Sequence, residues 1–323
     1  MNERELIRYL DKTLPRPPNT LSWMNEDCEI IELPKNENDL LLVNVDTSTE
    51  NVDFPIDAPD EEIGYFCTSL SISDVAACGG EPVGVLVSCC VSKLFEGRIL
   101  GIYEGIKLAA SDANTYILGG DTNSSDEFSL SIVTVGRVDR DRVLRRGRAK
   151  IGDIIGVTGD LSKFNDGFYD YRTKREIIDY KHMFHQQPPT QKGIILSSLG
   201  YVTSCIDLPD GLVKALDDNK GIGYGYLIYD AQIPIDTKRQ FHLQNQHHFE
   251  RASYPAGDIE LLFTIPPDRK DDAIARFDEA GMNLYFIGEV IPNPGIHINV
   301  ENQIIQPTAS GFVHEFGSKK LFA

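Results

Sequence analysis

Aspartates recur along this chain where apolar runs stop, and in two segments the aspartate lies close to paired glycines. These segments are SISDVAACGGEP at residues 71 to 82, with Asp74, and ILGGDTNSSDEF at residues 117 to 128, with Asp121. Similar acidic element ends carry Asp27, Asp46, Asp207, Asp210 and Asp258. A carboxylate at an element end can bind a hard cation, and glycine lets a phosphate approach the backbone closely. The pattern predicts a fold that gathers these ends around a metal and polyphosphate site.

Length and charge narrow the class of protein. A chain of 323 residues with 41% hydrophobic content can bury a large core, and its length favours two domains. The formal charge of -18 argues against nucleic acid and anionic membranes as partners, because both need a basic face. No apolar run reaches the length of a membrane span, and residues 2 to 13 predict a charged amphipathic helix rather than a leader peptide. We therefore expect a cytoplasmic protein.

The six cysteines show neither CxxC nor zinc spacing, and most of them lie in apolar segments. Buried free thiols are the expected state, because isolated cysteines behave as small apolar side chains.

Strand and helix patterns alternate in both halves of the chain, which predicts an α/β or α+β layered fold. The basic, glycine-punctuated segment at 139 to 153 predicts a crossing between an N-terminal domain, 1–140, and a C-terminal domain, 141–323. Residues 160 to 190 are polar and show little pattern. Helices are expected at 60–80, 94–113, 193–199, 210–216 and 268–280, and strands at 38–46, 81–91, 115–118, 128–138, 260–265 and 284–291. Residues 153–161 are expected to form a strand followed by a turn, and residues 220–235 a turn and a strand.

Familiar nucleotide-binding motifs are missing. The chain has no GxxxxGK[ST] loop and no protein-kinase HRD and DFG pair. The GIGYG segment at 221 to 225 lacks the spacing of a dinucleotide fingerprint and follows a predicted helix rather than a strand. A nucleotide-binding role would need another scaffold.

Eight segments, in order, match the motifs of one family. NEDCE resembles GDDCA, VDTSTENVDF resembles TDxxVEGxHF, SDVAACGGEP resembles SDxAAMGxxP, and RRGRAKIGD resembles RxGAKxGD. The others are LGGDT, IDLPDGL beside IDxSDGL, DIELLF beside DYELLF, and GFVHEF beside GYxHF. From about residue 20 to the C-terminus the chain resembles thiamine-monophosphate kinase. That superfamily also contains aminoimidazole ribonucleotide synthetase, selenophosphate synthetase and a hydrogenase maturation factor.

The resemblance implies a two-domain aminoimidazole ribonucleotide synthetase-like fold in a homodimer whose N-terminal sheets pair. It implies an ATP- and Mg²⁺-dependent phosphotransferase that converts thiamine phosphate and ATP to thiamine diphosphate and ADP. The metal ligands implied are Asp27, Asp46, Asp74, Asp121, Asp207 and Asp210. The ATP contacts implied are Tyr103, Gly120, Asp121 and Arg146, and the substrate contacts are Asp53, Glu260 and Phe312. No catalytic side chain is expected, because an acceptor phosphate is already ionised near neutral pH.

Several positions depart from the family pattern, mostly where substrate is expected. Asp53 replaces a histidine and Pro209 replaces a serine, and Asn44 and Val45 replace small hydroxyl residues that also serve as metal ligands in the family. Both arginines of an expected RPxPR segment are absent from HQQPPTQK at 185 to 192. These changes favour, as an alternative, a kinase or synthetase of the same superfamily that acts on a different small molecule. A third hypothesis is an inactive nucleotide-binding homologue.

Structural roles remain open for some of these residues. Asp210 has the position of a helix cap, and Asp74 and Asp121 are also residue types that cap helices and turns. Tyr103 and Phe312 each fit an ordinary core position. Asp53 is also consistent with a solvated loop acid.

Overall fold

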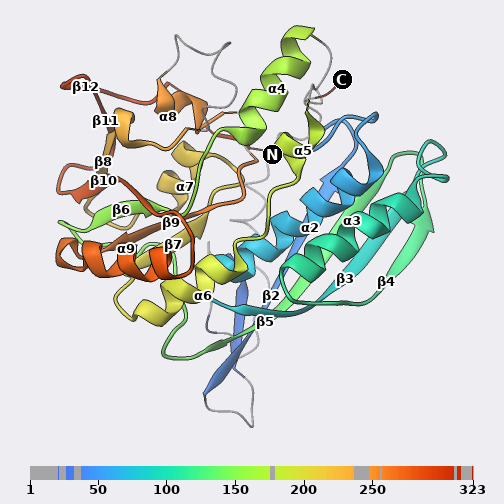
Figure 1. Ribbon diagram of the computed structural model, residues 1–323, viewed down its shortest axis with the longest axis horizontal. Helices are drawn as coiled ribbons and strands as arrows, with labels where there is room; N and C mark the ends of the chain where they lie inside the picture. Colours follow the sequence, from blue (N-terminus) through green and yellow to red (C-terminus); the bar gives the residue numbers. More distant parts are fainter. Residues whose placement is uncertain are drawn as a thin grey trace.

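The computed structural model describes residues 21, 27–32, 38–174, 179–235, 247–254, 257–308, 311–313 and 322. The helix predicted at residues 2 to 13 lies outside the described residues. Within them, the chain forms two sheets with helices packed between and around them (Figure 1). The mixed α/β fold that the sequence predicts is confirmed.

The first sheet comes from residues 29 to 139 and has the strand order β1-β2-β5-β3-β4. Only β3 and β4 pair in parallel, and the other neighbours are antiparallel. Every second residue of β5 is buried, as expected for a sheet with one face against a core. The strands are β1 (Glu29–Glu32), β2 (Asp39–Thr49), β3 (Glu81–Val91), β4 (Ile117–Ser124) and β5 (Ser129–Asp139).

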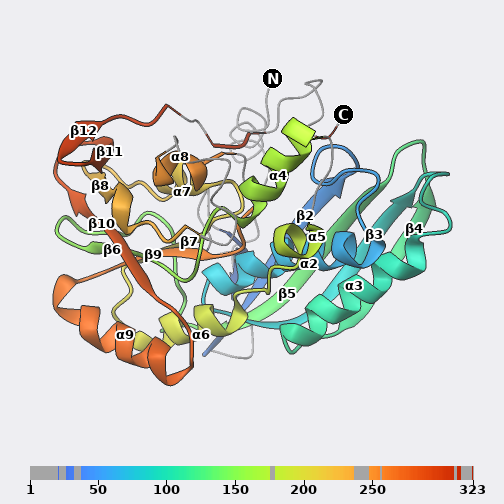
Figure 2. The same cartoon turned by 45° about the horizontal axis from the view of Figure 1, so that its top comes forward.

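Two helices, α2 (Asp60–Ala77) and α3 (Ile99–Asp112), cover one face of this sheet (Figures 1 and 2). They approach closely through glycines, because a Cβ on Gly64 would lie 1.9 Å from the Ile102 carbonyl oxygen. Helix α2 ends before Gly79, whose φ of 73° is the left-handed conformation that terminates helices. The predicted helix ended by glycines is therefore confirmed.

The second sheet comes from residues 154 to 305 and has the strand order β12-β11-β8-β10-β6-β9-β7. Its strands β8 and β11 are parallel, whereas the other neighbours are antiparallel. The strands are β6 (Ile154–Val157), β7 (Ser204–Asp207), β8 (Gly225–Tyr229), β9 (Leu261–Ile265), β10 (Tyr285–Ile291), β11 (Gly295–Val300) and β12 (Gln303–Ile305).

The remaining helices pack around the second sheet and against α2. They are α4 (Lys163–Lys174), α5 (Tyr180–Phe184), α6 (Thr190–Leu199), α7 (Leu212–Asp218), α8 (His248–Arg251) and α9 (Lys270–Glu279), with 3₁₀ turns at Asp230–Gln232 and Pro267–Arg269. Helix α6 lies between α2 and α9 (Figure 1). Its Gly193 touches α2, since a Cβ there would lie 2.1 Å from the Ala76 carbonyl oxygen. This contact holds α2 against the second half of the molecule.

The stretch 160 to 190, whose sequence shows little pattern, contains α4 and α5, because Phe164, Phe168 and Phe184 bury an aromatic face among the polar residues. Three expectations about local structure were wrong. The GGDT segment lies inside β4 rather than after it, where pairing with β3 extends the strand. Asp46 lies within β2, which continues to Thr49 through its pairing with β5. Helix α7 begins at Leu212, later than expected, because Gly211 has a φ of 88°.

None of the described helices is both long and apolar enough to cross a membrane.

The contact between α6 and α2 predicts that replacing Gly193 by alanine lowers stability more than the same replacement at an open position. Gly193→Ala should destabilise the protein by about 1 to 3 kcal/mol, because the methyl group would collide with backbone that packing holds in place. Gly97→Ala is the control, because a Cβ at Gly97 meets nothing within 4 Å, and it should change stability by less than about 0.5 kcal/mol. Urea unfolding measures both, and equal midpoints for the two variants would contradict the prediction.

Candidate functional site

A cavity of about 670 Å³ lies between the two halves of the molecule. Its walls come from β2 and α2 of the first half and from α4 and the segment after β7 of the second. Its lining includes five acidic residues, Asp27, Asp46, Asp74, Asp207 and Asp210. It also includes the apolar residues Val52, Phe66, Leu70, Phe164 and Phe312. The cavity thus combines carboxylates that can bind cations with apolar side chains against which an aromatic ring can pack.

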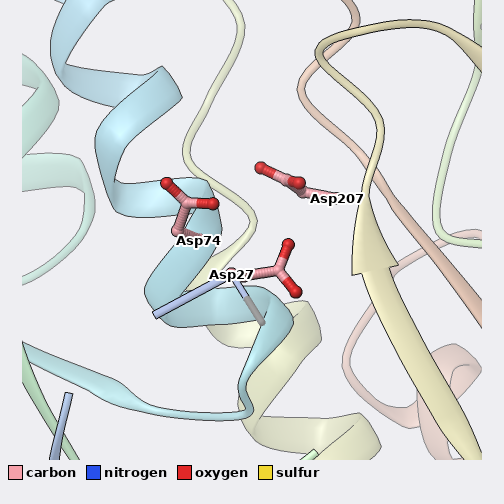
Figure 3. A group of neighbouring side chains, drawn as sticks. All are labelled: Asp27, Asp74 and Asp207. Carbon is pink, nitrogen blue, oxygen red and sulfur yellow. The ribbon is translucent and has the colours of Figure 1, made fainter. Parts of the chain in front are cut away.

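Three of these aspartates converge from segments far apart in the sequence. Asp27 precedes β1, Asp74 lies on α2, and Asp207 ends β7. One carboxylate oxygen from each lies within 4.8 Å of the others, and their side chains point toward a common space (Figure 3). Carboxylate oxygens at such spacing are suited to a hard divalent cation. The sequence-based expectation that these residues converge is met for this trio.

Neighbouring side chains hold the trio in place. The guanidinium of Arg146 donates to both carboxylate oxygens of Asp27, with 2.6 Å between Arg146 Nε and Asp27 Oδ2, and lies 3.7 Å from Asp207 Oδ1. Ser73 Oγ donates to Asp207 Oδ2 over 2.5 Å. One cation therefore offsets part of the negative charge of three carboxylates.

Burying several carboxylates close together is unfavourable, and this raises the pKa values of the aspartates. Burial raises the pKa of Asp74 well above its ordinary value, and the charges of Asp46, Asp207 and Asp27 raise it further. Burial and Asp27 likewise raise the pKa of Asp207, although Arg146 and Ser73 oppose the change. Burial also raises the pKa of Asp46, against hydrogen bonds from its neighbours. Buried carboxylates with raised pKa values are a common mark of functional sites.

Four other predicted residues also line the cavity. Asp46 lies on β2 in contact with Asp74, and Asp210 lies after β7, where its Oδ2 accepts from Lys214 Nζ over 3.2 Å. Asp210 does not cap α7, whose N-cap is Gly211. Asp53 Oδ2 accepts a hydrogen bond from the Thr49 backbone N–H over 2.6 Å, and Phe312 is among the apolar lining residues.

Asp121 and Gly120 lie outside this cavity. Asp121 pairs in register with Ser88, which pairs with Ser131, and Ser131 pairs with Thr47. Residues paired across a sheet share a face, so Asp121 lies on the outer face, opposite the one that α2 covers. Gly120 is required by close strand packing, because a Cβ there would lie 1.9 Å from the Val87 carbonyl oxygen.

Tyr103 and Glu260 also lie away from the cavity lining. Tyr103, on α3, packs against the core of the first half. Glu260 is 4% exposed and accepts from Lys192 Nζ at 2.8 and 2.6 Å and from Thr158 Oγ1 at 2.7 Å. Those bonds tie α6 to the second sheet. Lys192 comes from the segment in which the family arginines are absent.

Sequence reasoning missed several residues that shape the site. Asn44 donates from its side-chain amide to both Asp46 and Asp74. Ser73 and Phe66 contribute from α2. Asp258, which the sequence grouped with possible ligands, instead accepts from the Ser162 and Phe164 N–H groups at the start of α4. Ser73 carried a signal, because it directly precedes Asp74 in the SISD segment, and Asn44 carried one as a departure from the family pattern two residues before Asp46.

Comparisons with known proteins point to one family. The pattern of the AIR synthase related protein family, N-terminal domain, matches residues 25 to 138. A thiamine-monophosphate kinase of Haemophilus influenzae is 26% identical over 90% of this chain and 89% of its own length. The corresponding protein of Methanospirillum hungatei is 28% identical over 91% of this chain and 98% of its own.

This chain is similar to thiamine-monophosphate kinases along most of its length, and its first half matches the AIR synthase related family. A solved structure of AaThiL complexed with AMPPCP and TMP has the same fold, with a TM-score of 0.80. It is 22% identical and covers 97% of both chains. The family that the motif order predicts is confirmed.

The raised pKa values predict how stability depends on pH when no divalent cation is bound. A carboxyl whose pKa is higher in the folded than in the unfolded state binds more protons when folded, so stability falls as pH rises above the ordinary aspartate value of 3.8. With EDTA present, the free energy of unfolding should therefore decrease as the pH is raised from about 4 through the raised pKa values of these carboxyls. Urea unfolding at several pH values measures this slope, and stability that rises across the range would contradict the assignment.

Proposed function

We propose that this protein is an ATP-dependent thiamine-monophosphate kinase, which transfers the γ-phosphoryl group of ATP to thiamine monophosphate and forms thiamine diphosphate and ADP. One observation carries the proposal: three carboxylates converge in a cavity of a chain whose relatives along most of its length are thiamine-monophosphate kinases. Binding of AMPPCP and TMP by the related AaThiL supports the pair of substrates.

The proposal includes Mg²⁺ held by Asp27, Asp74 and Asp207, with Asp46 and Asp210 beside them. The donor set fits, because it consists of hard carboxylate oxygens within 4.8 Å of one another. Bound Mg²⁺ would supply positive charge between two mutually repelling phosphate groups. Asp121 is also proposed as a metal ligand, although it lies outside the cavity of its own chain.

The side chains of the protein bind and orient the substrates, and they are not required to transfer protons. An acceptor phosphate is ionised near neutral pH, so no general base is required. Arg146 and Ser73 hold the carboxylates of Asp27 and Asp207 in place. The aromatic lining residues Phe66, Phe164 and Phe312 offer apolar surface against which the acceptor's rings can pack.

Individual contact residues remain proposals. For ATP they are Tyr103, Gly120, Asp121 and Arg146, and for the acceptor they are Asp53, Glu260 and Phe312. Arg146, Asp53 and Phe312 are supported by their positions on the cavity wall. For Glu260, contact with the acceptor would require its bonds to Lys192 to break.

A homodimer is part of the proposal, with the outer face of the first sheet as the interface. Exposed apolar side chains support this, because Val45, Leu86 and Leu118 are 61%, 38% and 54% exposed. Exposed β-branched and leucine side chains on an open sheet face are costly in water. The cavity reaches the same face through Val45 and Thr47, so a second copy would border the site.

We also propose two domains with a boundary near residue 140. The division is supported by the strands, because the first sheet ends at Asp139 and the second begins at Ile154.

A cytoplasmic location is proposed as well. It is supported by the six free cysteines, five of them buried, which suit a reducing compartment.

The function is tested by incubating the purified protein with Mg²⁺, ATP and thiamine monophosphate and quantifying products by mass spectrometry. Thiamine diphosphate and ADP should form in equal amounts, and no thiamine diphosphate should form without the acceptor.

Asp74→Asn should lower kcat at least about 100-fold. The same variant should raise the unfolding midpoint in EDTA, because it removes a buried charge beside three others. ATP hydrolysis without thiamine diphosphate would instead favour another acceptor.

The dimer is tested by light scattering during size-exclusion chromatography. The wild-type protein should have twice the chain mass, whereas Val45→Glu combined with Leu118→Glu should be monomeric, because the interface would bury unpaired charges. Leu100→Glu on α3 is the control, because Leu100 is 79% exposed and lies on the helical side. A wild-type monomer at micromolar concentration would refute the proposed dimer.

A further inference from the structure

Two consecutive residues of α6, Lys192 and Gly193, contact opposite neighbours of that helix. Gly193 lies against α2, where a Cβ would come within 2.1 Å of the Ala76 carbonyl oxygen. Lys192 Nζ donates to both carboxylate oxygens of Glu260, at 2.8 and 2.6 Å, and Glu260 directly precedes β9. Helix α6 therefore connects α2 to the second sheet.

Glu260 extends this connection to the acidic cluster through its backbone. Its carbonyl oxygen accepts from the Leu208 N–H over 3.0 Å, and Leu208 directly follows Asp207. Its side chain also accepts from Thr158 Oγ1 over 2.7 Å, at the end of β6. Glu260 thus holds the end of β7 with its backbone and α6 with its side chain.

These contacts close into a circuit around two of the aspartates. Ser73 on α2 donates to Asp207 Oδ2 over 2.5 Å, and Ala76 lies three residues further along the same helix, with Asp74 between them. The circuit runs from α2 to the end of β7, then to Glu260, to α6 and back to α2. In a closely packed interior, no member of such a circuit can shift without disturbing the next contact.

The ion pair in this circuit is largely removed from water. The side chain of Glu260 is 6% exposed and that of Lys192 is 22% exposed. Such a pair adds little net stability, because the loss of hydration offsets most of the attraction between the charges. An ammonium group that donates to both oxygens of one carboxylate does fix its position. The pair is therefore better suited to setting geometry than to stabilising the fold.

We propose that Lys192 is a positioning residue, which holds Glu260 and thereby sets the separation between Asp74 and Asp207 at which their carboxylates share a cation. The inference rests on the proposed function, because it takes the cation site as given. Two carboxylates repel each other, so they stay at a cation-binding separation only when the elements that carry them are held. A site held in this way binds its ligand more tightly, since less ordering is needed on binding.

A binding measurement without turnover tests this assignment. Mn²⁺, which like Mg²⁺ prefers oxygen ligands, is titrated into the cation-free protein and followed by electron paramagnetic resonance. Lys192→Met keeps nearly the length of the side chain but loses the ammonium group, and it should weaken Mn²⁺ binding at least about threefold. Electrostatics alone predicts the opposite sign, because removing a positive charge near carboxylates tightens cation binding.

The double variant Lys192→Met with Glu260→Gln separates geometry from charge. It keeps the net charge and leaves no member of the pair buried and unpaired, so it should unfold at nearly the wild-type urea concentration. Its Mn²⁺ binding should still be at least about threefold weaker than wild type, because no ammonium group joins α6 to residue 260. The control is Lys107→Met on α3, which removes an exposed charge paired with Glu104, and it should bind Mn²⁺ like the wild type.

Wild-type Mn²⁺ affinity in the double variant would overturn the proposal, because the pair would then act on stability alone. Should Lys192→Met fail to fold, the double variant decides. A higher KM for thiamine monophosphate with unchanged Mn²⁺ affinity would place the pair at the acceptor and would also refute the proposal. Absence of Mn²⁺ binding by the wild type would refute it as well. Mn²⁺ binding that follows these expectations without thiamine phosphorylation would leave Lys192 assigned and remove only the proposed function.

Discussion

Packing of α2 against both halves of the molecule is the constraint on which the site depends. The helix covers the first sheet, touches β7 and contacts α6 through Gly193. Asp74 on α2 thereby meets Asp207 at the end of β7 and Asp27 before β1. Charges of like sign would separate if their elements were free to move, so the surrounding apolar packing holds the cluster together.

The cluster is only partly compensated by its own neighbours. Arg146 contributes one positive charge, and Ser73 and Asn44 contribute neutral donors. The raised pKa values of Asp46, Asp74 and Asp207 reflect the remaining imbalance. Such residual strain is typical of sites that are completed by a bound ion, because binding removes the repulsion that folding leaves. At position 74, a neutral residue such as asparagine would therefore favour stability, whereas the proposed function requires the aspartate.

The sequence predicted more of the architecture than of the site. Helix α2, its glycine ending and most strands follow from periodicity, and the order of motifs identifies the family. Helix α4 escaped prediction, because its apolar face consists of aromatic residues spread through a polar stretch. The position of Asp121 also escaped prediction, since the face on which a strand residue lies depends on register, which the sequence does not reveal. Bonds between distant residues, such as those of Lys192 with Glu260, leave no local signal at all.

The most direct test of the account is a crystal structure of the protein soaked with Mn²⁺ and a non-hydrolysable ATP analogue, with anomalous scattering used to locate the metal. The account predicts an anomalous peak within coordination distance of the carboxylates of Asp27, Asp74 and Asp207. Bound analogue with no peak beside these three residues would contradict the claim that their convergence forms the cation site.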